Sequence, residues 1–174
     1  DANTDFNATA KYRKAFGPTY YSMNIGKVHY IMLDNIHYIN APGGKIAKGI
    51  AGSRNYSYDI SPEQIAWLKQ DLELVVDKST PIVIGVHAPI FRYNNGRDGK
   101  INIALSSPSD KQLTELLRPF STVHILSGHS HRNRVTICSS DTTQPELANI
   151  TEHNIVSVAG SLWYSSGFGG PMLG

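Results

Sequence analysis

The spacing of hydrophobic residues divides the chain into a hairpin, two helices and four further strands. Residues 20–25 and 28–33 are rich in the apolar and aromatic residues typical of strands. Gly26-Lys27 joins them, and a glycine at the first central position of a two-residue connection favours a β-hairpin with a type II′ turn. The polar residues 1–17 that precede this hairpin are expected to form a loop or a short helix.

Two segments carry apolar residues at helical spacing. Ser61 and Pro62 begin the first, and Gln64 completes a capping box, so a helix is expected from there to about Asp77. Ser109 is expected to cap the second helix. The apolar faces contain Ile65, Leu68, Leu72, Val75 and Val76 in the first helix, and Leu113, Leu116, Leu117 and Phe120 in the second.

Four more segments are predicted to be strands. Residues 81–86 and 123–127 are short apolar runs of the kind found in buried strands. Residues 134–137 alternate polar and apolar side chains, and residues 153–159 form the last predicted strand. Helices that alternate with strands in this way predict an α/β fold with a mixed β-sheet.

Two long polar stretches, residues 40–58 and 91–108, separate these elements. Both contain glycine and lack a clear hydrophobic period, so both are expected to be loops. Loops of this length are often functional, and we expect these two to shape the mouth of a binding site.

Size and composition exclude several classes of protein. The 174 residues are typical of one domain, and a net charge of +2 without a basic stripe excludes a broad nucleic-acid-binding face. No apolar run is long enough for a membrane-spanning helix. Cys138 is the only cysteine, which excludes an internal disulfide and a cysteine-rich zinc module. The sequence leaves the cellular location open, with a slight lean towards an exported or periplasmic protein.

Histidines follow two of the predicted strands at the point where each strand ends. Residues 81–86 lead into His87-Ala88-Pro89, and residues 123–127 lead into Gly128-His129-Ser130-His131. Imidazole binds Zn, Fe, Mn, Co and Ni without discriminating among them. Gly128 would allow the backbone to approach closely beside these histidines. The pattern therefore predicts a metal site of His87, His129 and His131 at one edge of the sheet.

Each of these histidines also has a simpler interpretation. His129 and His131 fit a polar turn with two surface histidines, and His87 fits a histidine whose hydrogen bonds are satisfied by nearby backbone. His124 lies within a predicted strand and is expected to be structural or exposed. The remaining histidines lack a motif and are expected to be structural: His29, His37 and His153.

Three short segments share their order and spacing with motifs of a known enzyme family. Gly85-Val86-His87-Ala88-Pro89 ends a strand in histidine, residues 128–131 form a Gly-His-x-His motif, and Gln64-x-x-Trp67-Leu68 lies on the first helix. Together with the hairpin at residues 20–34, these segments resemble the C-terminal half of a calcineurin-like metallophosphoesterase. The resemblance covers most of residues 16–164.

This resemblance implies a fold, a metal centre and an activity. The fold is a four-layer α/β/β/α sandwich, of which the chain would supply a mixed-sheet half. Two divalent metal ions would lie at the sheet edge, with His87 and His129 on the second ion and His131 on the first. A hydroxide that bridges the ions would hydrolyse a phosphate mono- or diester. No further catalytic residue is assigned.

Two arginines are candidates for binding the phosphate of a small phosphorylated substrate. Arg92 and Arg132 lie near the two histidine motifs in the sequence, and arginine matches phosphate oxygens in a bidentate fashion. Each also fits an ordinary solvated arginine on the surface.

The sequence lacks other motifs of the same family. Asp-x-His, Gly-Asp-x-x-Asp and Gly-Asn-His-Asp, which would supply the bridging carboxylate and the remaining ligands, do not occur. We therefore expect residues 1–174 to be the C-terminal part of a single metallophosphoesterase domain whose N-terminal half is its partner. Alone, the chain is expected to load little or no metal and to be weakly active or inactive. An uncovered apolar sheet should also cause self-association or instability.

Two other functions fit the same residues. One is a non-catalytic ligand-binding or interaction module, in which the histidines are incidental and aromatic, Asn-rich segments such as residues 91–95 make the contacts. The other is a mononuclear zinc hydrolase, in which His87, His129 and His131 leave one coordination position open. The phosphoesterase is favoured over both.

Overall fold

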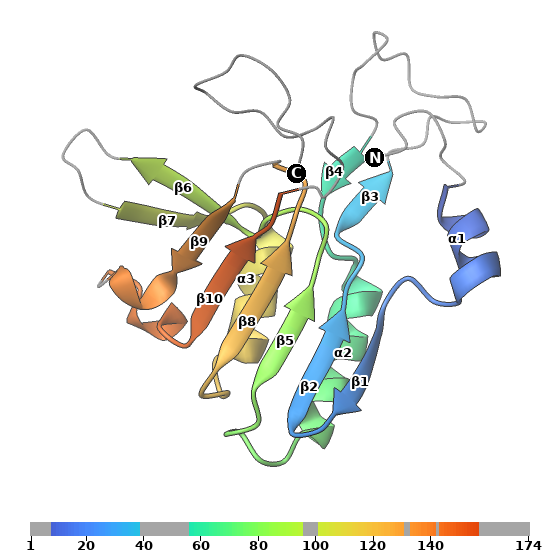
Figure 1. Cartoon of the computed structure of the whole chain (residues 1–174), viewed down its shortest axis with the longest axis horizontal. Coiled ribbons are helices and arrows are strands. Elements are labelled where there is room, and N and C mark those ends of the chain that lie inside the picture. Colours follow the sequence, from blue (N-terminus) through green and yellow to red (C-terminus); the bar gives the residue numbers. More distant parts are fainter. Residues whose placement is uncertain (1–7, 39–55, 96–100, 131–132, 142, 157–174) are drawn as a thin grey trace, which may run out of the picture.

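The computed structural model describes residues 8–38, 56–95, 101–130, 133–141 and 143–156 of the chain (Figure 1). The α-helices are α1 (Ala8–Phe16), α2 (Pro62–Leu74) and α3 (Pro108–Leu117). The strands are β1 (Tyr21–Ile25), β2 (Val28–Met32), β3 (Ile36–Tyr38), β4 (Tyr56–Tyr58), β5 (Ile82–Gly85), β6 (Phe91–Asn95), β7 (Ile101–Leu105), β8 (Val123–Ser127), β9 (Arg134–Ile137) and β10 (Ile150–Asn154). Two 3-10 helices, Cys138–Ser140 and Pro145–Leu147, precede β10.

Six strands form one mixed sheet in the order β1-β2-β5-β8-β10-β9. The central strands β2, β5, β8 and β10 pair in parallel, whereas β1 and β9 pair antiparallel at the two edges. Two smaller ladders, β3-β4 and β6-β7, lie at the end of this sheet where the central strands finish (Figure 1). The α/β class with a mixed sheet is therefore confirmed.

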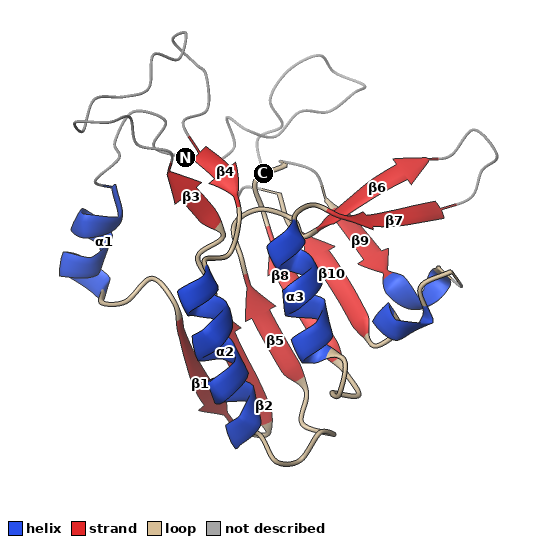
Figure 2. Ribbon diagram, turned by 180° about the vertical axis from the view of Figure 1, so that it is seen from behind, coloured by secondary structure: helices blue, strands red, loops and turns tan. Residues whose placement is uncertain are grey.

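The hydrophobic core lies between this sheet and two helices on one of its faces. Figure 2 shows α2 and α3 side by side over the central strands. Ile82 and Ile84 of β5 and Ile125 of β8 are completely buried, and they belong to one apolar cluster with Leu68 of α2 and Leu113 of α3. Burial of each such side chain stabilises the fold by roughly 1.5–3 kcal/mol. This packing makes the central strands a rigid base for the residues at their ends.

The opposite face of the sheet is apolar and exposed among the described residues. Alternate residues of a strand point to opposite faces, so the residues beside the buried ones point away from α2 and α3. Leu126, Val135 and Ile137 on this face are 38%, 53% and 51% exposed, and Met23 is 39% exposed. The expectation of an uncovered apolar sheet surface thus holds for the described part of the chain.

Both predicted helices form, but each has one boundary that differs from the prediction. Ser61 caps α2 as expected and its Oγ accepts a hydrogen bond from Gln64 N (3.3 Å), although the helix ends at Leu74. The cap of α3 is Ser107, whose Oγ accepts from Asp110 N (3.2 Å). The predicted cap, Ser109, was wrong, because Pro108 occupies the first helical position that proline prefers and so places the cap one residue before it.

Two predicted loops contain strands, and the last strand begins earlier than expected. Within residues 40–58, the last three residues form β4, which pairs with β3; residues 40–55 lie outside the described residues. Within residues 91–108, β6 and β7 form a hairpin. β3 and β4 have only three residues each and β6 is mostly polar, so their hydrophobic period is weak, whereas the alternating apolar residues of β7 were a signal that the prediction missed. The strand predicted at residues 153–159 begins at Ile150 and ends at Asn154, and residues 157–159 are outside the described part.

The turn of the first hairpin and the short helix that precedes it agree with the sequence. Gly26 has a positive φ of 60°, which explains the glycine between β1 and β2. The short helix considered for residues 1–17 is α1. Within the described ranges, the helices are all too short or too polar to cross a membrane.

Candidate metal centre

The two histidine-bearing turns meet at the carboxyl ends of β5 and β8. These strands are parallel neighbours, so both turns leave the sheet at the same edge. The backbones stay paired beyond the strands: Val86 N donates to Leu126 O (3.0 Å), and Gly128 N donates to His87 O (2.9 Å). The turn after each strand is thus placed directly beside the other.

Two of the three predicted metal ligands lie together in this arrangement. His87 Nε2 and His129 Nδ1 are 3.1 Å apart, and the two ring centroids are 5.0 Å apart. His87 is exposed and His129 is half-buried. His131 lies outside the described residues, so its place in the site stays a prediction. Within the described part of the chain, no group of three or more metal-binding side chains gathers.

The backbone of His129 has a left-handed conformation. Its φ is 64°, and no other non-glycine residue among those described has a positive φ. For a residue with a Cβ this conformation costs about 1–2 kcal/mol, and such strain is concentrated at functional sites. Gly128, by contrast, needs no special space, since an added Cβ would make only ordinary contacts of 3.8 Å with His87 O and Ile155 O. The close approach predicted at Gly128 is therefore wrong, and the special backbone belongs to His129.

Asn35 holds the turn that carries His87. Its Oδ1 accepts hydrogen bonds from His87 N and Ala88 N, both 3.0 Å, and its Nδ2 donates to Ala88 O (2.7 Å). Asn35 is only 3% exposed. Gln64 of α2 fixes the preceding residue, because its side chain bonds both the N–H and the C=O of Asp34 (2.9 and 2.8 Å). Helix α2 is thereby connected to Asp34, and the next residue, Asn35, connects this segment to the turn of His87.

Asn154 holds the turn that carries His129 in the same manner. It ends β10 and is 2% exposed. Its Nδ2 donates to Gly128 O (2.5 Å) and Ser127 Oγ (3.1 Å), and its Oδ1 accepts a hydrogen bond from Ser130 Oγ. One buried asparagine therefore fixes each of the two histidine turns.

Three aromatic rings surround the imidazole of His129. Tyr58 Oη lies 2.6 Å from His129 Nε2, and the two ring centroids are 5.0 Å apart. The ring of Tyr56 lies 6.2 Å away and nearly perpendicular, at 85°. The third ring is that of His87, which faces His129 Nδ1, whereas Tyr58 faces His129 Nε2. These contacts restrict the rotation of a side chain whose backbone is already fixed.

Glu152 supports the segment that follows His87. Its carboxylate accepts hydrogen bonds from the backbone N–H groups of Ile90 (2.9 Å) and Phe91 (3.2 Å), and the residue is 1% exposed. Burial raises the pKa of Glu152, an effect that these hydrogen bonds and the nearby Arg134 reduce only in part. A buried acid thus fixes the chain between His87 and β6.

A shallow pocket of about 360 Å³ opens beside His129. One predicted phosphate-binding residue, Arg92, lines it and is exposed, while Arg132 lies outside the described residues. Arg134 also lines this pocket, and sequence reasoning did not select it. The remaining walls are Tyr58, Ala88, Pro89, Phe91 and Ser106.

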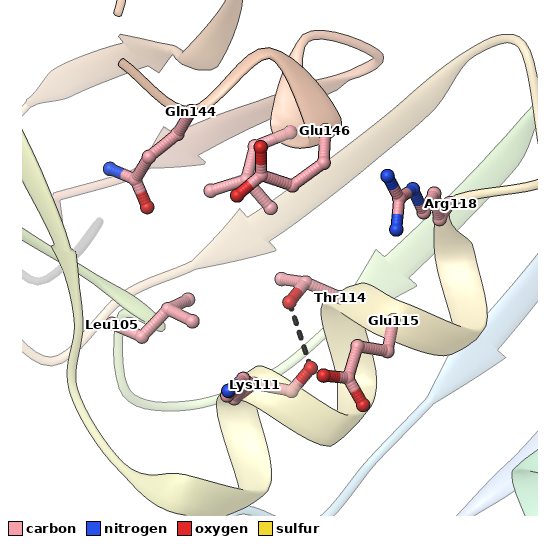
Figure 3. A pocket seen from close by; sticks show the side chains of 8 residues that line it. Leu105, Lys111, Thr114, Glu115, Arg118, Gln144 and Glu146 are labelled. Atoms are coloured by element: carbon pink, nitrogen blue, oxygen red, sulfur yellow. Dashed lines mark hydrogen bonds between the residues drawn. The ribbon is translucent and has the colours of Figure 1, made fainter.

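A second pocket, of about 380 Å³, lies between α3 and the 3-10 helix Pro145–Leu147 (Figure 3). Two basic and two acidic side chains line it, so it has no preference for a charged ligand. It contains none of the candidate histidines. The lining residues are Leu105, Lys111, Thr114, Glu115, Arg118, Gln144, Glu146 and Leu147.

Three histidines outside the site have structural partners, as expected from the sequence. His29 is 4% exposed, and its Nε2 lies 2.8 Å from Asp71 Oδ2. His124 Nδ1 and His153 Nε2 are 3.1 Å apart on the neighbouring strands β8 and β10.

Comparisons with known proteins show the fold. No protein-family model and no curated protein matches the chain. Among solved structures, the chain is similar to a dimetal phosphatase from Danio rerio, with a TM-score of 0.53 and 11% identity over 84% of this chain and 51% of that one. A 5′-nucleotidase from Candida albicans has a TM-score of 0.39 and 16% identity over 81% of this chain and 21% of its own. The chain therefore shares part of the fold of the dimetal phosphatase and spans about half of its length.

Proposed function

We propose that the chain is part of a metal-dependent phosphoesterase of the calcineurin-like type, which hydrolyses a phosphate mono- or diester. The observation that carries this proposal is the convergence of His87 Nε2 and His129 Nδ1, 3.1 Å apart, at the carboxyl edge of the sheet. The sheet belongs to a fold that is similar to part of a dimetal phosphatase. A left-handed backbone at His129 and two buried asparagines hold the pair in place.

The donor pair fits a divalent metal ion. Two imidazole nitrogens, each about 2.0–2.1 Å from one ion, lie roughly 2.8–3.4 Å apart when the angle between the bonds is between a right angle and a tetrahedral one. The separation of 3.1 Å falls in this interval. His87 and His129 would hold one ion, and His131 would hold a second. Bound divalent ions supply Lewis acidity and activate water at neutral pH.

The residues around the pair suit binding of a phosphate ester. Arg92 and Arg134 line the pocket beside His129, and Arg132 follows His131 in the sequence. Guanidinium groups bind phosphate oxygens by charge and by paired hydrogen bonds. Tyr58 provides an aromatic wall in the same pocket for the organic part of the substrate.

The chain needs further ligands to complete a dinuclear centre. Imidazoles are neutral when they bind metal and do not balance the charge of two divalent ions. We propose that carboxylates from an N-terminal half of the same domain supply this charge and that this half covers the exposed apolar face of the sheet. The chain alone should therefore bind metal weakly, hydrolyse little substrate and associate with itself.

Metal titration of the purified chain tests this proposal. Zn²⁺ and Mn²⁺ binding is measured by calorimetry for the wild type, for His87→Ala/His129→Ala and for the control His124→Ala/His153→Ala. The control removes two imidazoles at the same nitrogen separation, so it isolates the effect of position. We expect weak binding by the wild type and the control, and a loss of about tenfold or more in affinity for the first variant.

Turnover distinguishes the alternatives. With p-nitrophenyl phosphate and its bis-ester, the chain alone should show little metal-dependent hydrolysis. One zinc ion per chain with vigorous unaided turnover would instead support the mononuclear three-histidine hydrolase. Absence of metal binding at millimolar concentrations, both for the chain alone and for the chain together with an N-terminal half of the domain, would support the non-catalytic binding module.

A further inference from the structure

The two nitrogens of His129 have different partners. Nδ1 faces His87 Nε2 at 3.1 Å, and Nε2 faces Tyr58 Oη at 2.6 Å. A neutral imidazole carries one proton, so one of its nitrogens donates and the other accepts. The partner of the nitrogen that does not bind metal commonly decides which nitrogen does bind it. In this chain that partner is a tyrosine hydroxyl, which accepts from an Nε2–H or donates to an unprotonated Nε2.

We propose that Tyr58 is a positioning residue that holds His129 in the Nε2–H tautomer. The Nε2–H donates to Tyr58 Oη, which leaves the lone pair of Nδ1 directed towards His87 and available to a metal ion. This role rests on the proposed metal-dependent function. The tautomer itself exists without metal and is measured separately.

Tyr58 is fixed well enough to act in this way. It pairs with Ile36 in the β3-β4 ladder, and the next residue, Asp59, donates its N–H to Asn35 O (3.2 Å). Asn35 is the same residue that holds the turn of His87. A backbone hydrogen bond therefore links the segment that carries the hydroxyl of Tyr58 to Asn35, whose side-chain amide fixes the turn of His87.

The proposed tautomer also defines the proton on His87. With no proton on His129 Nδ1, the contact of 3.1 Å requires that His87 Nε2–H donates to it in the metal-free chain. A metal ion that bound both nitrogens would require this proton to be on Nδ1 of His87 and not on Nε2, whereas His129 would need no change. One of the two ligands is thus prepared before the metal binds.

Long-range ¹H–¹⁵N correlation spectra of the histidine rings test the tautomer directly. The spectra are recorded with EDTA at pH about 8, above the ordinary titration range of imidazole, on the wild type, Tyr58→Phe and Tyr30→Phe. His129→Gln assigns the signals. Tyr58→Phe keeps the ring that contacts Tyr56 and His129 and removes only the hydroxyl. Tyr30→Phe removes a hydroxyl on β2, away from the histidine turns.

We expect the Nε2–H tautomer in the wild type and in Tyr30→Phe, and a mixture of both tautomers in Tyr58→Phe. An Nδ1–H tautomer in the wild type, or no change in Tyr58→Phe, overturns the proposal. Zn²⁺ affinity gives the second measurement, with a loss of about tenfold expected for Tyr58→Phe and none for Tyr30→Phe. A shifted tautomer with unchanged affinity removes the role in metal binding. A wild type that binds no metal overturns the role of Tyr58 in metal binding by this chain alone, while the spectra still decide whether Tyr58 sets the tautomer.

Discussion

Two pairs of histidines in this molecule have the same separation and different structural origins. His87 and His129 lie at the ends of β5 and β8, and His124 and His153 lie within β8 and β10; each pair has two ring nitrogens 3.1 Å apart. The rings of the first pair are inclined by 72° and those of the second by 34°. Proximity alone therefore does not distinguish a candidate metal site from a structural contact.

The second pair results from the register of the sheet. His124 is opposite Thr151, and His153 is opposite Leu126, so the two imidazoles are diagonal neighbours on one face of adjacent strands. Such neighbours come within reach of each other in any regular ladder. No unusual backbone is needed, since both histidines have ordinary strand conformations.

The first pair depends on irregular backbone that other residues must hold. His129 has a φ of 64°, and neither histidine lies within a strand. Asn35 and Asn154, both almost completely buried, make hydrogen bonds to the two turns. Strained conformations persist where the surrounding structure over-determines them. The comparison indicates that the structure is specialised around the first pair and not around the second.

The largest expected difference between the two pairs concerns the free energy of unfolding, and it should follow removal of the Asn35 side-chain amide. Asn35→Leu deletes three hydrogen bonds and leaves His87 N, Ala88 N and Ala88 O without this partner in the interior. Because each buried unsatisfied group costs about 1–3 kcal/mol, we expect the free energy of unfolding to fall by about 3 kcal/mol. Thr151→Val, which alters the neighbour of His124, should change it by about 0.5 kcal/mol or less.

Urea denaturation of both variants measures this difference. Equal effects of Asn35→Leu and Thr151→Val would show that the first pair needs no more support than the second.

The pH dependence of stability should be of intermediate size and should arise on the helix-covered side of the sheet. Burial raises the pKa of Asp110 to about 6, against the lowering effect of hydrogen bonds involving Ser107, and the nearby Glu152 and Asp59 raise it further. Glu152, which supports the chain after His87, has a raised pKa as well. A raised carboxyl pKa means that the folded state binds the proton more tightly than the unfolded state does.

The contribution of Asp110 to the free energy of unfolding should therefore be most favourable below about pH 4. It should decrease as the pH rises from 3.8, the ordinary pKa of this carboxyl, to about 6. The decrease due to Asp110 is at most about 3 kcal/mol, because one pKa unit corresponds to about 1.4 kcal/mol. Asp110→Asn should flatten this part of the profile when the free energy of unfolding is measured by urea denaturation from pH 4 to pH 8. A profile that keeps its slope in the variant would assign the dependence to another group.

The sequence predicts the strands and the helix start near the site better than the residues that hold the histidine turns. Apolar runs located β5 and β8, and the capping serine and proline located the start of α2, because these signals act over a few residues. The histidines at the strand ends were found for the same reason. The position of Ser107 was also available, since Pro108 marks the first turn of α3.

The residues that support the site could not be found by such signals. Asn35 contacts a turn 52 residues away, and Tyr58 contacts a histidine 71 residues away. In the sequence, Asn35 is an ordinary turn residue, and Tyr58 lies at the end of a polar stretch without hydrophobic period. Their roles arise from the meeting of three separate strand ends, which a local pattern does not record.

The smallest expected effect is the difference in the free energy of unfolding between a glycine and an alanine variant at one histidine of each pair. This difference should have opposite signs at the two positions. Both residues remove the imidazole, so the difference between them reports the backbone alone. At His129, whose φ is 64°, glycine should be more stable than alanine by about 1 kcal/mol, because a Cβ is disfavoured in the left-handed region. At His124, within β8, glycine should be less stable than alanine by about 0.5–1 kcal/mol.

The four variants His129→Gly, His129→Ala, His124→Gly and His124→Ala are compared by urea denaturation without metal. The same preference for alanine at both positions would show that the turn relaxes once its imidazole is removed. In that case the side-chain contacts of His129 with Tyr58 and His87 would impose the left-handed backbone. A reversed preference at position 129 shows that the surrounding turn imposes this conformation, and that the histidine occupies a backbone made ready for it by Asn154.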